Sequence, residues 1–205
     1  GADLVLIETM SDSYEAKAAV LAAKENCDLP VLVTLIFDEK GKLLTGGTVD
    51  STVAMLEGLR VDALGVNCGL GPKQMHPIIE RLTQVSSLPI IVNPNAGLPR
   101  SENGKTVFDI APAEFSDLME EIAGMGVQAL GGCCGTTPEH LRLTIEKCRK
   151  VPFRPPVAKR RTVVSSFSQA VEIGPKPVII GERINPTGKS KFKAGSLSQL
   201  ITSFI

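Results

Sequence analysis

The sequence predicts an α/β fold in which buried parallel strands alternate with helices. Five runs rich in valine, isoleucine and leucine recur along the chain, at residues 3–9, 30–37, 62–68, 89–95 and 127–133. Continuous apolar runs of this length are typical of strands that are buried on both faces of a parallel sheet. Amphipathic stretches separate the runs, and this alternation is the pattern of repeated βα units.

Four of the amphipathic stretches carry signals for the start of a helix. In the first, Asp12 is followed three residues later by Glu15, which is the spacing of a capping box. We expect Ala18, Leu21 and Ala22 to form the apolar face of that helix. The later signals are a proline at the first helical position, or a threonine directly before one. The predicted helices begin at Asp12, Pro72, Pro112 and Thr137.

The strand starts recur about every 30 residues, which suggests one βα unit repeated along the chain. A doubly wound sheet and a (β/α)8 barrel are both compatible with this repeat. In both architectures the active site lies at the C-terminal ends of the strands. The polar and thiol residues at the ends of the predicted strands are Glu8, Cys68, Asn95, Cys133 and Cys134.

The composition favours a small-molecule enzyme of the cytoplasm. The 22 lysine and arginine residues balance 22 aspartate and glutamate residues, so no overall field attracts nucleic acid or an anionic membrane. No segment approaches the roughly 20 apolar residues of a membrane span, and the first residues lack the basic flank of a signal peptide. In a reducing compartment, the five cysteines favour metal binding or catalysis over disulfides.

Residues 151–177 differ in character from the rest of the chain. Proline, serine and basic residues replace the apolar periodicity there, so we expect a linker between two domains, with the basic run 159–161 solvated. The following stretch, VIIGERINPTGKSKFK, is similar to the first strand and loop of a second domain. The predicted domains are therefore residues 1–150, the linker 151–177 and the start of a second domain at 178–205.

The adjacent cysteines of ALGGCCGTTPEHL allow several interpretations. A vicinal disulfide would close a strained small ring. A redox pair would need a Cys-x-x-Cys spacing, which is absent, and a cysteine nucleophile would need His76 or His140 as its partner. The interpretation that both cysteines only pack in the core stays open as well. Cys27 and Cys148 lie within or beside predicted helices and are expected to be packing residues.

Zinc binding is the remaining interpretation. Neighbouring side chains of a strand point to opposite faces, so Cys133 and Cys134 could bind one ion only where the strand ends and the backbone bends. Gly131, Gly132 and Gly135 are expected to permit that bend. Cys68 occupies a similar strand end and could supply a third thiolate.

Three thiolates would leave one position of a tetrahedral site open, which is typical of catalytic rather than structural zinc. A thiol that entered this position would lose its proton to the field of the metal. The chemistry that this arrangement suggests is alkyl transfer to a thiol. His140, in the first turn of the last predicted helix, is expected to be solvated or to lie behind the ligands.

The motifs GVNCGLGP, NPNAGLP and GGCCGTTPEH together resemble the homocysteine-binding module of the homocysteine S-methyltransferase family, over about residues 1–150. The resemblance implies a (β/α)8 barrel, zinc held by Cys68, Cys133 and Cys134, and homocysteine as the methyl acceptor. It also implies that Glu8 receives the substrate ammonium group and that Asn95 is a weak fourth ligand of the metal. A surface role for Glu8 and a turn-stabilising role for Asn95 stay open.

The second motif, GERINPTGKS, ends like a phosphate-binding loop, but Arg183 stands where that motif requires its first glycine. GERINPTG instead resembles the start of the pterin-binding barrel in the cobalamin-dependent methionine synthase family. The resemblance implies that Asn185 lies at a folate site, with Glu182 and Arg183 as its neighbours. It further implies methyl transfer from 5-methyltetrahydrofolate, through cobalamin bound by a domain outside this chain, to homocysteine, giving methionine.

We therefore expect a piece of a methyltransferase: about the last five βα units of a (β/α)8 barrel, a linker, and the first strand of a second barrel. An open barrel exposes apolar strand edges, so the piece by itself is expected to be poorly soluble and inactive. Two alternatives stay open. A homocysteine S-methyltransferase that uses betaine or S-methylmethionine should lack the GERINPTG extension, and a structural zinc module should supply a fourth strong protein ligand.

Overall fold

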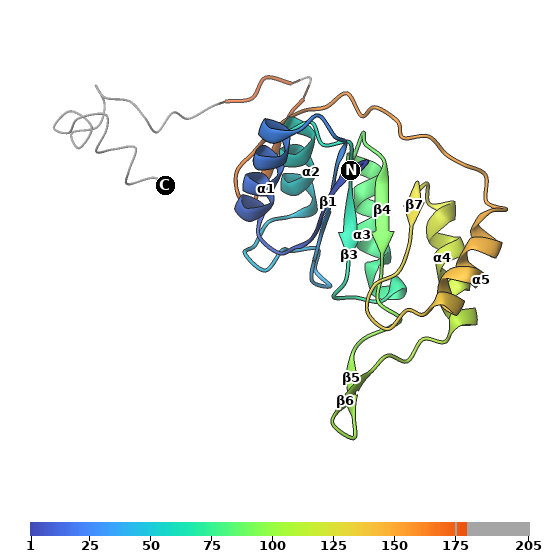
Figure 1. Ribbon diagram of the computed structural model, residues 1–205. Coiled ribbons are helices and arrows are strands. Elements are labelled where there is room, and N and C mark those ends of the chain that lie inside the picture. Colours follow the sequence, from blue (N-terminus) through green and yellow to red (C-terminus); the bar gives the residue numbers. More distant parts are fainter. Residues whose placement is uncertain (175, 180–205) are drawn as a thin grey trace. The chain divides into compact units, whose positions relative to one another are not determined.

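A five-stranded parallel sheet forms the centre of the structure, in the strand order β1-β2-β3-β4-β7 (Figure 1). The structure is a computed structural model that describes residues 1–174 and 176–179, and the chain divides into two units, residues 1–172 and 173–205. The strands of the sheet are β1 Val5–Met10, β2 Val31–Leu35, β3 Ala63–Asn67, β4 Ile90–Asn93 and β7 Ala129–Leu130. All neighbouring pairs are parallel, which confirms the predicted α/β class.

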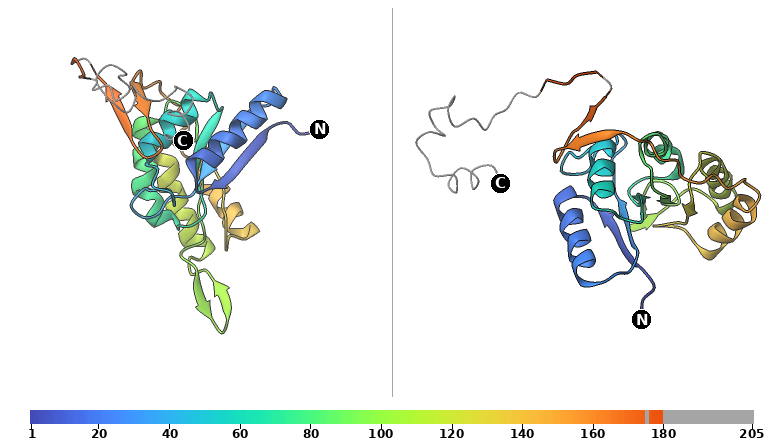
Figure 2. Two further views of the ribbon diagram at one scale, coloured as in Figure 1. Left: turned by 90° about the vertical axis from the view of Figure 1, so that its left-hand side faces the viewer. Right: turned by 90° about the horizontal axis from the view of Figure 1, so that it is seen from above.

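A helix follows each strand of the sheet, and the helices lie in an arc along one of its faces (Figure 2). They are α1 Ser13–Asn26, α2 Val49–Gly58, α3 Pro72–Val85, α4 Pro112–Gly124 and α5 Pro138–Cys148. Five βα units in this arrangement are consistent with part of a (β/α)8 barrel. The expected start of a second barrel, at residues 178–205, lies outside the described residues from residue 180 onward.

The core lies between this face of the sheet and the helices. Alternate residues of the central strands point into it, such as Val31 and Val33 of β2. Strand β3 is buried along its whole length, as expected for a strand covered on both faces. Strand β1 is different, because Leu6 and Glu8 on its other face are exposed. Among the described residues, no helix has both the length and the apolar character needed to cross a membrane.

The predicted helix starts agree with the structure. Asp12 precedes α1 and its Oδ1 accepts the N–H of Glu15 at 2.8 Å, and prolines open three further helices. The predicted apolar face of α1 is wrong, since Ala18, Leu21 and Ala22 are exposed. Helix α1 instead buries the stripe Ser13, Ala16 and Val20. The small side chains on this stripe allow the helix to pack closely on the sheet.

Two short antiparallel sheets were not predicted. The first joins β5, Arg100–Glu102, to β6, Lys105–Val107, between β4 and α4. Its turn residues Asn103 and Gly104 have φ angles of 50° and 74°. Positive φ at both positions is typical of the two-residue turn that matches the twist of a hairpin.

The second sheet lies inside the expected linker. Strand β8, Thr162–Ser165, packs on α2, and β9 is Ala170–Ile173 (Figure 2). The Phe167 ring between these strands lies 5.0 Å from the Tyr14 ring of α1. Residues 151–172 therefore fall within the first unit, and the segment expected as a linker contains two strands. This segment has a low apolar content, and polar contacts hold it to the rest of the unit. A hydropathy pattern does not reveal such contacts.

These polar contacts lie along residues 154–161. Gln128 donates from Nε2 to the carbonyl oxygen of Arg154 at 2.8 Å, and the N–H of Lys159 donates to Ser87 Oγ at 3.0 Å. The basic run is also partly engaged rather than fully solvated, because Arg161 forms an ion pair with Glu172 at 2.6 Å.

Substitution of Gly65 tests the close packing of β3 on β4. A Cβ atom at Gly65 would lie 1.9 Å from the carbonyl oxygen of Ile91, so the strands must separate to accept it. We expect Gly65→Ala to lower the free energy of unfolding by more than about 3 kcal/mol, measured by urea denaturation of the full-length protein. The matched control is Gly58→Ala, because a Cβ there has no neighbour within 4 Å. Equal stability of the two variants would contradict the described strand packing.

Candidate metal centre

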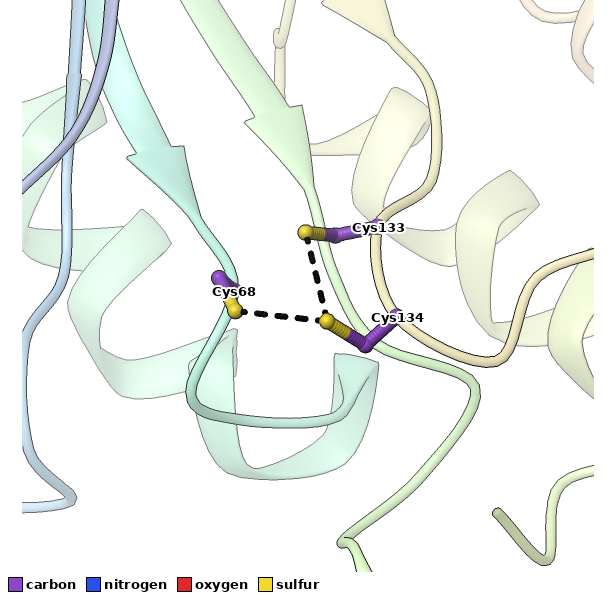
Figure 3. Close-up of side chains that lie close together, drawn as sticks. All are labelled: Cys68, Cys133 and Cys134. Carbon is purple, nitrogen blue, oxygen red and sulfur yellow. Dashed lines mark hydrogen bonds between the residues drawn. The ribbon is translucent and has the colours of Figure 1, made fainter. Parts of the chain in front are cut away.

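Three cysteines meet at the C-terminal edge of the sheet (Figure 3). The Sγ atom of Cys134 lies 3.7 Å from that of Cys68 and 3.9 Å from that of Cys133. All three sulfur atoms lie within 4.8 Å of one another. Cys27 and Cys148 are not part of this cluster, and all five cysteines are free thiols. The structure thus brings together the three cysteines that the sequence singled out.

Cys68 is positioned by a tight turn directly after β3. Its own N–H still pairs with the carbonyl oxygen of Asn93 on β4, at 3.1 Å. The next residues leave the strand abruptly: the N–H of Leu70 donates back to the carbonyl oxygen of Cys68 at 2.8 Å, which closes a γ-turn at Gly69. Gly69 has a φ of 73°, and Cys68 itself has a φ of 59°, which is uncommon for a residue with a side chain.

Cys133 and Cys134 are fixed by the loop that follows β4. The N–H of Cys133 donates to the carbonyl oxygen of Pro94 at 2.8 Å, and the N–H of Ala96 donates to the carbonyl oxygen of Cys134 at 2.9 Å. Between these bonds, the N–H of Cys134 donates to Asn95 Oδ1 at 3.1 Å. The loops after β4 and β7 therefore hold each other in place, and both thiols come to the same side of the backbone (Figure 3).

Two of the three glycines beside the cysteines act differently from the expectation. Of the three, only Gly135 has a positive φ, of 80°. Gly131 and Gly132 are required for space: a Cβ would lie 2.5 Å from Asn93 Oδ1 in the first case and 2.6 Å from Thr136 Oγ1 in the second. The two glycines before the cysteines thus permit close approach of neighbouring side chains rather than an unusual backbone angle.

The protonation of the cluster depends on its surroundings. Burial, together with the neighbouring Cys68, raises the pKa of the Cys133 thiol to about 11. Without a cation, Cys133 is therefore a neutral thiol near pH 7. A positive ion among the sulfurs would reverse this preference, because it stabilises the thiolate.

Two of the three sulfur separations match those around a tetrahedral zinc ion. A zinc–sulfur bond of about 2.3 Å at tetrahedral angles places the sulfur atoms about 3.8 Å apart. The distances of 3.7 Å and 3.9 Å lie on either side of this value. Among the described residues, no further histidine, cysteine or carboxylate joins the cluster. The donor set therefore suits zinc with one position open to a ligand from outside.

The other predicted site residues take different positions. Asn95 is buried and its Oδ1 is bonded to the Cys134 backbone, so it lies beside the cluster. Glu8 is exposed on β1, and no described residue bonds to its carboxylate. The predicted folate residue Asn185, with Glu182 and Arg183, lies outside the described residues.

Of the two expectations for His140, the solvated position is wrong, because the residue is only 5% exposed. Its Nε2 donates to the carbonyl oxygen of Ile110 at 3.0 Å, and its Nδ1 accepts the N–H of Thr137 at 3.2 Å. The ring meets Phe115 edge-on, with centroids 5.3 Å apart. Both ring nitrogens are occupied, so His140 anchors the start of α5 instead of binding a metal.

Sequence reasoning missed two residues of the site, Asn67 and Thr9. Asn67 ends β3, and its amide contacts both Thr9 and the sulfur of Cys133. The available signal was a polar residue in the otherwise apolar run DALGVNC, directly before Cys68. Thr9 carried no such signal, because its contact depends on a break in the pairing of β1.

Comparisons with known proteins agree with this site. Residues 1–148 match the family described as homocysteine S-methyltransferase. Methionine synthase of Mycobacterium leprae is 33% identical over 97% of this chain, and that of Mycobacterium tuberculosis is 31% identical over 97%. The chain spans only 18% and 17% of the length of these two relatives.

Solved structures of the homocysteine methyltransferase MmuM from Escherichia coli are also similar. The apo form has a TM-score of 0.59 at 24% identity, covering 72% of this chain and 50% of that one. The metallated form has a TM-score of 0.57 at 26% identity, covering 73% of this chain and 46% of that one. With the family match over 148 residues, this establishes that the chain belongs to the homocysteine S-methyltransferase family.

Proposed function

We propose that this chain carries the thiol-activating site of a methionine synthase, which transfers a methyl group to the sulfur of homocysteine. The observation that carries the proposal is the cluster of Cys68, Cys133 and Cys134, in which two sulfur separations match those of a tetrahedral zinc site and all lie within 4.8 Å. Family membership and the likeness to a relative solved in a metallated form support it.

Zinc held by these cysteines supplies Lewis acidity that lowers the pKa of an entering thiol. The residues of the chain then have distinct roles. The three thiolates keep electron density on the entering sulfur, and Asn95 fixes the backbone of Cys134. Because an amide oxygen has two lone pairs, Asn95 Oδ1 retains one that can serve as a weak, displaceable ligand.

In the proposed reaction, the thiol proton of homocysteine first passes to solvent. A sulfur lone pair then forms the bond to the methyl carbon, while the bond between that carbon and its donor breaks and leaves its electron pair on the donor. No protein side chain forms a covalent bond to the methyl group. The chain contributes by holding the nucleophilic sulfur at a fixed point on the edge of the sheet.

Glu8 is proposed to bind the ammonium group of homocysteine. It lies on the C-terminal half of β1, and its exposed carboxylate is free of partners among the described residues. A carboxylate at this end of the sheet could form a charge-assisted hydrogen bond with the substrate.

The proposed methyl donor is 5-methyltetrahydrofolate, with cobalamin as the carrier bound by another domain. Similarity to the methionine synthases covers 97% of the chain, whereas likeness to the homocysteine methyltransferase structures covers 72–73%. The first similarity therefore continues beyond residue 148 into the GERINPTG segment, where Asn185 is the proposed folate residue. This extension favours the folate donor over betaine or S-methylmethionine.

Metal analysis of the full-length protein tests the central claim. We expect one zinc ion per chain, its loss in Cys68→Ala and in Cys133→Ala, and an additional sulfur in the zinc-edge X-ray absorption spectrum after homocysteine is added. Cys27→Ala is the matched control and should retain zinc, because Cys27 lies outside the cluster. Four protein ligands that homocysteine leaves unchanged would instead indicate a structural zinc module.

The cluster should show a metal-dependent titration. In the metal-free protein the Cys133 thiol is expected to ionise near pH 11, as seen in the ultraviolet thiolate absorbance that Cys133→Ala lacks. Since this pKa is raised by folding, the contribution of Cys133 to stability is complete below about pH 9 and declines as the pH rises towards 11. Zinc should shift the ionisation below neutral pH with release of a proton. Ionisation at or below pH 9 without metal would contradict the described burial.

The role of Glu8 can be tested kinetically. We expect Glu8→Gln to raise the KM for homocysteine roughly 10- to 100-fold, through loss of a charge-assisted hydrogen bond, with kcat changed less than about twofold. Asp28→Asn is the control, since Asp28 is an exposed carboxylate in the loop before β2. An unchanged KM in Glu8→Gln would assign Glu8 to the solvated surface.

A further inference from the structure

The side chain of Asn67 joins the end of β1 to the cysteine cluster. Asn67 is the last residue of β3 and is only 1% exposed. Its Nδ2 group donates to Thr9 Oγ1 at 2.7 Å and to Cys133 Sγ at 3.9 Å. Its Oδ1 accepts the N–H of Thr9 at 2.9 Å. Both amide protons are therefore used, and one of them is directed to a sulfur atom.

The backbone of Thr9 is arranged to make this contact. Thr9 has a φ of 65°, a conformation that β-branched residues rarely adopt. The pairing of β1 with β2 is interrupted between Ile7 and Met10, which frees the N–H of Thr9 for Asn67. Since β2 lies between β1 and β3, Thr9 reaches past a whole strand to form these bonds. Strain of this kind persists where surrounding contacts hold it in place.

The contact is specific to one of the three sulfurs. Among the described residues, Cys133 alone in the cluster has a side-chain amide as its donor, whereas Asn95 bonds to the backbone of Cys134. An N–H donor withdraws electron density from a thiolate, and groups of this kind orient metal ligands and tune the metal. The hydrogen bond therefore makes Cys133 a different electronic donor from Cys68.

We propose that Asn67 is a positioning residue of the metal centre. Its amide orients the Cys133 thiolate and limits the electron density that this sulfur donates to the metal. Through Thr9, the same amide couples Cys133 to the segment that carries Glu8. The inference rests on the proposed function, because it assumes a metal bound by the three cysteines. A weaker donor at Cys133 leaves the metal better able to stabilise the thiolate of an entering substrate.

The test compares two variants of the full-length protein loaded with Co²⁺ in place of zinc. Asn67→Asp keeps oxygen acceptors for the N–H and O–H of Thr9 but has no N–H for sulfur. We expect its sulfur-to-cobalt charge-transfer band to move to longer wavelength, because the Cys133 electrons are held less tightly. Thr9→Val is the matched control: it removes the hydroxyl contact and leaves the Asn67 amide able to bond Cys133, so the band should stay in place.

An unchanged band in Asn67→Asp would overturn the inference. An equal shift in both variants would overturn it as well, because the effect would then arise from β1 rather than from the bond to sulfur. If the parent protein itself binds no Co²⁺ through sulfur, the proposed function fails first, and this outcome is distinct from the other two.

A measurement on the parent protein covers the case in which Asn67→Asp does not fold. In isotope-labelled protein loaded with an NMR-active cadmium isotope, we expect a scalar coupling between the cadmium nucleus and one Nδ2 proton of Asn67, transmitted through the Cys133 sulfur. Such a coupling supports the inference. Its absence, in a sample whose cysteine β protons do couple to cadmium, overturns it.

Discussion

The structure depends on one constraint: thiols that are 66 residues apart in the sequence must converge to within 4 Å of each other. Parallel strands bring these thiols near each other, because the C-terminal ends of such strands lie at one edge of the sheet. The strand ends alone do not set the distances between the sulfur atoms. The remaining precision comes from hydrogen bonds between neighbouring loops, above all those of residues 94–96 with Cys133 and Cys134.

The strands of the main sheet and four of the five helices that follow them could be predicted from the sequence because their causes are local. Apolar runs identified every strand of the main sheet, and prolines at first helical positions marked three helices. The three cysteines could be chosen from five because each followed a strand end beside glycine. These features need only short-range patterns and the rule that parallel strands share one active edge.

The wrong or missing predictions have a different origin, since they concern which other part of the fold a helix, strand or side chain packs against. Helix α1 buries the face that carries small residues, because these let the helix pack closely on the sheet, and its larger Leu21 is exposed to solvent. The hairpin at residues 100–107 had an Asn-Gly turn signal that stood outside the expected alternation of strands and helices. His140 and Asn67 are buried by contacts with distant residues, Ile110 and Thr9, which no local pattern reports.

The steric demand at Gly131 and Gly132 bears on how such centres are recognised across proteins. A description based on metal ligands alone would treat both glycines as spacers before the cysteine pair. Their missing side chains also shape the site, because a Cβ at either position would meet the side chain of Asn93 or Thr136, which would then have to shift. Two cysteines after a bulkier pair would therefore share the ligand spacing of this chain but require Asn93 or Thr136 to take another position. The informative signature is the tetrapeptide Gly-Gly-Cys-Cys, read together with the side chains that pack against it.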